Sequence, residues 1–170
     1  RPESLPADRL LNDGFEQLAQ RFDPHWGGFG KAPKFPMGHA LSYLLRVWNR
    51  EKNPKVLEDT GRSTALADVP QARASGLEMV EITLQKISEG GLVDQLGGGF
   101  HRYSTDERWF LPHFEKMLYD QALLTKAYLE AYQATGNARY AKVAGETLDY
   151  VLREMTSAEG AFYSAQDADS

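Results

Sequence analysis

The sequence contains no cysteine among its 170 residues. Disulfides, thiolate metal sites and catalytic thiols are therefore excluded for this chain. It also contains no apolar run that approaches the roughly 20 residues needed to cross a bilayer. We therefore expect no membrane partner. The sequence leaves the cellular compartment open, with the cytosol only as the default.

A dense block of lysine and arginine is missing as well. The chain has 19 Lys and Arg residues against 24 Asp and Glu residues, for a formal net charge of -5. Proteins that hold a polyphosphate backbone usually gather positive charge on one face. We therefore expect no nucleic-acid partner.

The residues that are present predict one compact helical unit. Hydrophobic residues make up 42% of the chain and charged residues 25%, which is typical of globular domains. Apolar residues at helical spacing predict five helices, at residues 5–22, 37–51, 72–88, 112–134 and 138–155. The inward positions expected on the last helix are Tyr140, Val143, Ala144, Leu148, Val151 and Leu152. A long loop is expected at residues 52–71 and a short hairpin at residues 100–110.

A glycine-aromatic phrase recurs after alternate helices. It reads WGGFG at residues 26–30, LGGGFHRYS at 96–104 and EGAFYSAQ at 159–166. A fixed phrase at this period is the signature of repeated helical hairpins. We therefore predict that the three loops lie at one end of an array of helices. Apolar flanks of the outermost helices should be exposed.

Three longer stretches carry a family resemblance. GGFGKAPKFP (27–36), GGLVDQLGGGFHRYSTDERWFLPHFEKMLYD (90–120) and GAFYSAQDADS (160–170) resemble the thioredoxin-domain-containing proteins of the spermatogenesis-associated family. The resemblance implies an all-α fold, part of an α/α toroid of the six-hairpin glycosidase-like type, related in fold to N-acylglucosamine 2-epimerases. It implies that residues 1–170 are a single fragment of that toroid. A thioredoxin-like domain is then expected upstream and the remaining hairpins downstream. Gln121 departs from this pattern, where the family has Asn.

Polar chemistry concentrates at the start of the predicted fourth helix. At about 100° per residue, His113, Lys116 and Asp120 would share one face of a helix that begins at Pro112. Glu115 and Tyr119 would form a second polar pair. These groups stand among aromatic residues, and an aromatic lining with a few acids is what a sugar pocket needs. The competing interpretation is an ordinary helix start with a solvated charged turn.

Two kinds of reaction are open to these groups. A pair of carboxylates could hydrolyse a glycosidic bond. A histidine could instead move a proton at a carbon next to a carbonyl, as in 2-epimerases. Our catalytic candidates are His101, Asp106, His113, Glu115 and Asp120. The ligand-binding candidates are Asp94, Arg102, Tyr103, Trp109, Tyr119 and Asp167. Glu107 and Asp169 complete the set of carboxylates considered, and His25 and His39 are expected to be structural.

No cofactor and no metal is predicted. Asp167 and Asp169 form an Asp-x-Asp pair, which is weak evidence for a metal without further oxygen ligands. The sequence therefore favours a carbohydrate-active module, hydrolase or 2-epimerase in type, that binds a sugar-like small molecule. The alternative is a non-catalytic helical module that binds a partner or positions a thioredoxin-like domain. In either case the remainder of its own chain is an expected partner.

Overall fold

A computed structural model describes residues 7–52 and 74–169 of the chain. Within these residues the helices are α1 (Ala7–Arg21), α2 (Gly38–Lys52), α4 (Gly76–Glu89), α5 (Leu118–Thr135) and α6 (Ala138–Glu154). Two short antiparallel pairs join β1 (Tyr103–Ser104) to β2 (Pro112–His113), and β3 (Lys116–Met117) to β4 (Ala165–Gln166). The predicted all-α class is confirmed. The loop predicted at residues 52–71 lies outside the described residues except for Lys52, which ends α2.

The predicted fourth helix begins six residues late. Residues 112–117 are extended because their backbone groups pair with other segments: β2 pairs with β1, β3 pairs with β4, and the Glu115 carbonyl accepts from the Arg102 N–H at 2.8 Å. Helix α5 starts only at Leu118. The prediction that His113, Lys116 and Asp120 share one helix face is therefore wrong, since only Asp120 lies on α5.

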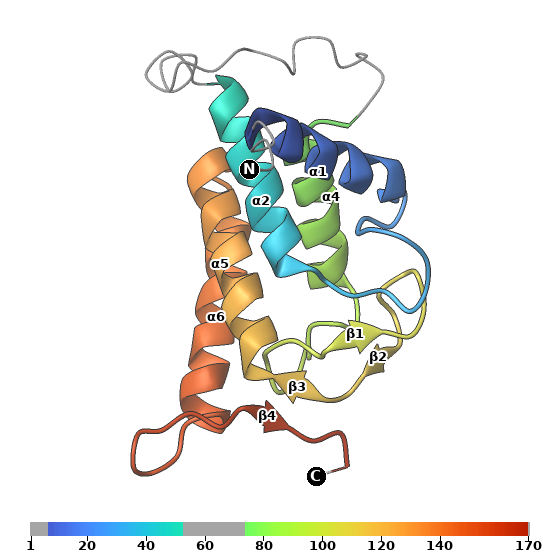
Figure 1. The fold of residues 1–170 in the computed structure, drawn as a ribbon. Coiled ribbons are helices and arrows are strands. Elements are labelled where there is room, and N and C mark those ends of the chain that lie inside the picture. The colour runs from blue at the N-terminus through green and yellow to red at the C-terminus, as the bar shows by residue number, and fades with distance from the viewer. Residues whose placement is uncertain (1–6, 53–73, 170) are drawn as a thin grey trace, which may run out of the picture.

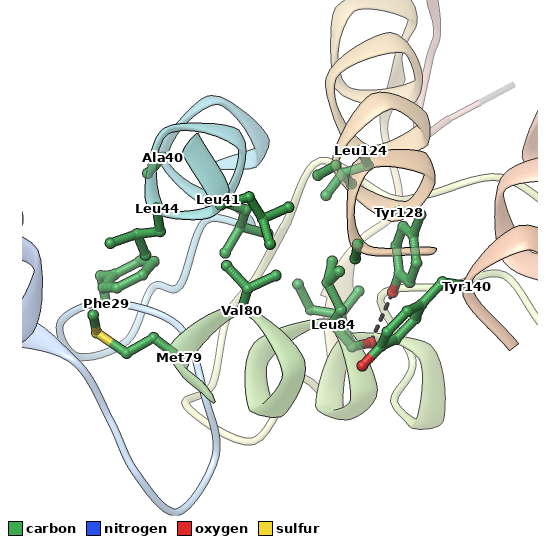
Figure 2. Close-up of a cluster of buried hydrophobic side chains, with 14 of the residues drawn as sticks. Phe29, Ala40, Leu41, Leu44, Met79, Val80, Leu84, Leu124, Tyr128 and Tyr140 are labelled. Carbon is green, nitrogen blue, oxygen red and sulfur yellow. Dashed lines mark hydrogen bonds between the residues drawn. The ribbon is translucent and has the colours of Figure 1, made fainter. Parts of the chain in front are cut away.

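Helices α2 and α5 pack side by side and run in the same direction, with α4 and α6 running the opposite way (Figure 1). The backbones of α2 and α5 approach closely at Gly38, where an added Cβ would lie 2.9 Å from the Leu123 carbonyl carbon. Figure 2 shows the core between α2, α4 and α5, in which the Tyr128 hydroxyl donates to the Leu84 carbonyl at 2.8 Å. The core side chains drawn there include Leu41, Leu44, Met79, Val80, Leu84 and Leu124.

Helix α6 buries a narrower face than its apolar pattern predicts. Tyr140 and Ala144 are buried as expected. Leu148 and Leu152 are 47% and 64% exposed, so the prediction that they face inward is wrong. At 100° per residue they lie about 40° and 80° around the helix from Ala144, on a flank that α5 does not cover. The expected exposed apolar flank is therefore found on α6. Among the described helices none combines the length and apolarity needed to span a membrane.

The three glycine-aromatic loops lie at the same end of the helices, as predicted (Figure 1). Each is closed by one antiparallel bridge: Phe22 with Phe29, Val93 with Phe100, and Thr156 with Phe162. Backbone bonds join the loops to one another, from Lys34 to Ser104 and from Leu118 to Ser164. The repeat seen in the sequence is thus a repeat of structure.

Two loops carry the same aspartate–lysine staple. Asp23 accepts from two backbone N–H groups through one oxygen and from Lys34 Nζ at 2.7 Å through the other. Asp94 does the same in the second loop, with Lys116 Nζ at 2.8 Å. Both lysines are buried, so each needs this partner. Asp94 thereby anchors the strand that leads into α5.

Candidate functional site

A polar cluster forms where the β1–β2 pair meets the start of α5. It consists of Arg102, His113, Glu115, Tyr119 and Asp120, and we call it the Arg102 cluster. Arg102 Nη1 donates to Glu115 Oε2 at 2.7 Å. His113 Nδ1 lies 4.0 Å from the same carboxylate oxygen. Glu115 and Tyr119 together raise the pKa of Arg102, so the guanidinium keeps its charge.

The strand pairing explains why these side chains meet. In the antiparallel register Tyr103 lies opposite His113, and their rings stack with centroids 4.9 Å apart and planes 19° apart. Phe35 extends this stack, because the Lys34–Ser104 backbone bonds place its ring 4.8 Å from the Tyr103 ring. Phe35 is 46% exposed. An aromatic edge therefore borders the polar cluster.

Asp120 is the most perturbed carboxyl of the cluster. Burial raises its pKa from 3.8 to about 6; the nearby Arg102 charge lowers it and the Glu115 charge raises it further. Asp120 sits in the first turn of α5, where the helix dipole favours a negative charge. Burial outweighs that effect. The carboxyl can therefore gain and lose a proton close to neutral pH.

Three polar atoms of the cluster are buried without a hydrogen-bond partner in the described part of the chain. They are Arg102 Nε, His113 Nδ1 and Asp120 Oδ2. Unpaired buried polar atoms destabilise a fold by about 1 to 3 kcal/mol each, so each needs a physical reason. The two other such atoms among the described residues, Thr125 Oγ1 and Glu130 Oε2, lie farther along α5. The gathering of the three cluster atoms in one place identifies this cluster as the candidate site.

Two other candidates are not members of the cluster as defined, His101 and Asp167. His101 is buried, with Nδ1 3.0 Å from the Phe114 carbonyl oxygen and its ring edge-on to Phe114. Burial lowers the pKa of His101, which keeps the imidazole neutral. Asp167 is exposed near the end of the last loop, where one of its oxygens lies 3.5 Å from the Asp169 N–H.

Asp106 and Trp109 hold the loop between β1 and β2. The Asp106 carboxylate accepts from three backbone N–H groups of its own loop, those of Arg108, Phe110 and Leu111. These bonds lower its pKa. Trp109 is fully buried and donates its indole N–H to the Trp26 carbonyl at 2.8 Å. Asp94, Asp106 and Trp109 are thus held by partners outside the Arg102 cluster. Asp167 follows β4, whose antiparallel register pairs Gln166 with Lys116 and so brings Asp167 opposite Glu115 of the cluster.

The sequence reasoning missed two positions beside this site. Phe35 stands in the first repeat, in the stretch KFP, and only the contact between repeats shows that it meets Tyr103. Gln121 is buried, and its amide both accepts from the Phe100 N–H and donates to the Phe100 carbonyl. It fixes the second loop against α5. Among the described residues no group of three or more His, Asp or Glu side chains could hold a metal ion.

Comparison with curated proteins finds homologues. Human spermatogenesis-associated protein 20 is 43% identical over 164 residues, which cover 96% of this chain and 19% of that protein. The mouse protein of the same name is 42% identical over 156 residues, covering 92% of this chain and 18% of that protein. An uncharacterized protein of Caenorhabditis elegans is 35% identical over 179 residues, covering 100% of this chain and 22% of that protein. The chain thus spans about a fifth of the length of these relatives. No protein-family model matches it.

Comparison with solved structures finds sugar epimerases and isomerases. Cellobiose 2-epimerase from Bacillus thermoamylovorans superposes with a TM-score of 0.61 at 15% identity, covering 95% of this chain and 42% of that one. Cellobiose 2-epimerase from Spirochaeta thermophila superposes with a TM-score of 0.61 at 19% identity, covering 95% of this chain and 40% of that one. A D-mannose isomerase superposes with a TM-score of 0.56 at 18% identity, covering 84% of this chain and 30% of that one. At these identities the likeness establishes the fold, which is the predicted partial α/α toroid.

Proposed function

We propose that this chain belongs to a sugar-converting enzyme of the spermatogenesis-associated, thioredoxin-domain-containing family, and that the Arg102 cluster is its acid–base site. The reaction proposed is epimerisation or isomerisation at a sugar carbon next to a carbonyl. One observation carries the proposal: the half-buried Asp120 carboxyl has one buried, unpaired oxygen and a pKa raised to about 6, beside a charged arginine. The structural likeness to sugar epimerases and isomerases supports the reaction class.

The chemistry assigns a role to each group. Ionised Asp120 takes the proton from the carbon next to the carbonyl, and the electron pair moves to the carbonyl oxygen. Arg102 stabilises the negative charge that develops on this oxygen, because its guanidinium stays protonated. For epimerisation, a second acid then gives a proton to the same carbon from the opposite face. For isomerisation, the former carbonyl carbon takes a proton, its oxygen is protonated, and the hydroxyl on the neighbouring carbon loses its proton to become the new carbonyl. In this proposal protonated His113, whose Nδ1 lies 4.0 Å from Glu115 Oε2, supplies the proton to the opposite face, and exchange with solvent afterwards restores both Asp120 and His113.

The aromatic edge supplies the binding surface. Sugar rings place their apolar C–H faces on aromatic rings and direct their hydroxyls to charged groups. The Phe35–Tyr103–His113 stack lies beside the charged residues and offers such a face. The remaining hairpins of a toroid would close the pocket around this wall.

Deuterium exchange tests this function. The full chain is incubated in D2O with a panel of aldoses, ketoses and N-acetylhexosamines, and proton NMR follows the signal at C2. We expect exchange in at least one sugar, and a loss of about 100-fold or more in Asp120→Asn, because general acid–base catalysis contributes at least that much. Asp149→Asn is the matched control, since Asp149 is exposed on α6.

The other outcomes separate the alternatives. Glycoside cleavage without exchange at C2 would favour a hydrolase that uses Glu115 and Asp120 as its carboxylate pair. A sugar-induced rise in melting temperature without turnover would favour a non-catalytic binding module. The proposal would be overturned if no sugar showed exchange at C2, underwent cleavage or stabilised the protein.

A further inference from the structure

A concave surface lies apart from the Arg102 cluster and shares no residue with it. It is a groove of about 720 Å³ between the end of α4 and the loop that joins β1 to β2. Trp26, Phe110 and Leu111 form its apolar walls. Lys86 Nζ and Arg108 Cζ lie 5.6 Å and 5.4 Å from the centre of the Trp26 ring. We call this surface the Trp26 groove.

The groove is built by an anchored loop. Trp109 has a φ of 64° and a fully buried ring, which its indole N–H ties to the Trp26 carbonyl. The Gly91 N–H donates to the Trp109 carbonyl at 2.7 Å, and an added Cβ at Gly91 would collide with the Phe110 carbonyl oxygen. With Trp109 held inward, its neighbour Phe110 is 78% exposed. The exposure of this aromatic ring is thus imposed by the anchored backbone.

The two cations of the groove have no carboxylate partner in the described ranges of the chain. Their contacts are with the Trp26 ring. The two acids nearby are engaged elsewhere: Asp106 accepts from three backbone N–H groups, and Glu89 accepts from Gln85 at 2.9 Å. The groove therefore presents unused cationic donors beside exposed apolar rings, on a chain whose net charge is -5.

We propose that the Trp26 groove binds a segment of a partner protein in which an acidic side chain lies next to a bulky apolar one. Tryptophan, phenylalanine and arginine are the residues that protein interfaces concentrate at their centres. The apolar side chain of the segment would pack on Trp26 and Phe110. Its carboxylate would pair with Arg108 and Lys86, which the chain's own acids leave available.

A peptide titration of the full chain tests this assignment. The probe is acetyl-Asp-Phe-Glu-Leu-amide, and its match without charge is acetyl-Asn-Phe-Gln-Leu-amide. ¹H–¹⁵N NMR follows the tryptophan indole N–H signals. We expect the Trp26 signal to move with the acidic peptide and the hydrogen-bonded Trp109 signal to move much less. The double substitution Lys86→Gln and Arg108→Gln should weaken binding about fivefold or more, as loss of two exposed ion pairs predicts.

Lys126→Gln is the control, because Lys126 is an exposed cation on α5 and does not line the groove. It should bind the acidic peptide as the unsubstituted chain does. Equal binding of the two peptides, or no movement of the Trp26 signal, would overturn the proposal. Phenylacetate binding as tightly as the peptide would make the groove a small-molecule site instead. Movement of the Trp26 signal with protein concentration alone would assign the groove to a second copy of the chain.

Discussion

Replacing Asp120 by Asn should make the protein more stable at pH 8. The folded-state pKa of Asp120 is raised from 3.8 to about 6, so ionising this carboxyl favours the unfolded chain. The stability that its neutral form supplies is fully present below pH 3.8 and is lost as pH rises through about 6. A shift of about two pH units corresponds to at most about 3 kcal/mol, and solvent screening of this half-buried carboxyl reduces that value. Asn cannot ionise, so the variant escapes this loss.

The pH dependence isolates the effect from any change in packing. Urea unfolding of both proteins at pH 4 and pH 8 gives the stability difference at each pH, and the change between the two values should be about 2 kcal/mol in favour of the variant, because part of the loss has already occurred at pH 4. The other titrating groups are common to both proteins and cancel. A stability difference that is the same at pH 4 and pH 8 would refute the assignment of a buried, weakly acidic Asp120.

Three further changes have defined outcomes. Asp94→Asn should destabilise the fold by about 2 kcal/mol at pH 7, because the Lys116 partner and the loop N–H groups hold the Asp94 pKa at about 2. The stability difference between the two proteins should shrink as pH falls from 4 toward 2, and urea unfolding at each pH measures it. Gly99→Ala should destabilise the fold by about 2 to 4 kcal/mol, since its Cβ would collide with the Tyr150 ring. Gly136→Ala, at a similar positive φ with open space around it, should destabilise by only about 1 kcal/mol, and thermal unfolding of both variants measures the difference. Trp109→Phe should cost about 2 to 4 kcal/mol in urea unfolding, since it removes buried volume and the indole donor; a loss under 0.5 kcal/mol would show that the anchor is unimportant.

The helices and the repeated loops could be predicted because their signals are local. Apolar spacing gave α2 and α6 to within about one residue at each end, and the glycine-aromatic phrases marked the three loops. Several glycines of these loops have positive φ, among them Gly28 and Gly99, which explains why glycine recurs there. The short pattern therefore contained the physical reason for the turn.

The start of α5 could not be predicted because its backbone partners are distant in the chain. Pro112 fits the first turn of a helix as well as the start of a strand. The choice is made by β1 and β4, which pair with residues 112–117, and β4 lies about 50 residues farther along the sequence. Such pairing outweighs the local helical preference of residues 112–117. The prediction that His113 and Asp120 share one helix face was therefore wrong.

The different roles of the carboxylates also could not be predicted from the sequence. Asp94, Asp106 and Asp120 belong to the same polar stretch of the sequence, yet they have different surroundings. Asp94 and Asp106 accept hydrogen bonds from backbone N–H groups, which lower their pKa values. Asp120 is half-buried, with one buried oxygen that has no hydrogen-bond partner among the described residues, and its pKa is raised. Only the three-dimensional structure shows where each oxygen points.

Direct titration of the Asp120 carboxyl tests the central claim most directly. ¹³C NMR of the side-chain carboxyl carbon follows its ionisation from pH 3 to pH 9, with Asp120→Asn identifying the signal. We predict a midpoint near pH 6 in the free protein, moving by at least half a pH unit when the best sugar of the exchange panel is added. A midpoint below pH 4 that no sugar changes would contradict the claim that Asp120 is the acid–base group of a sugar site.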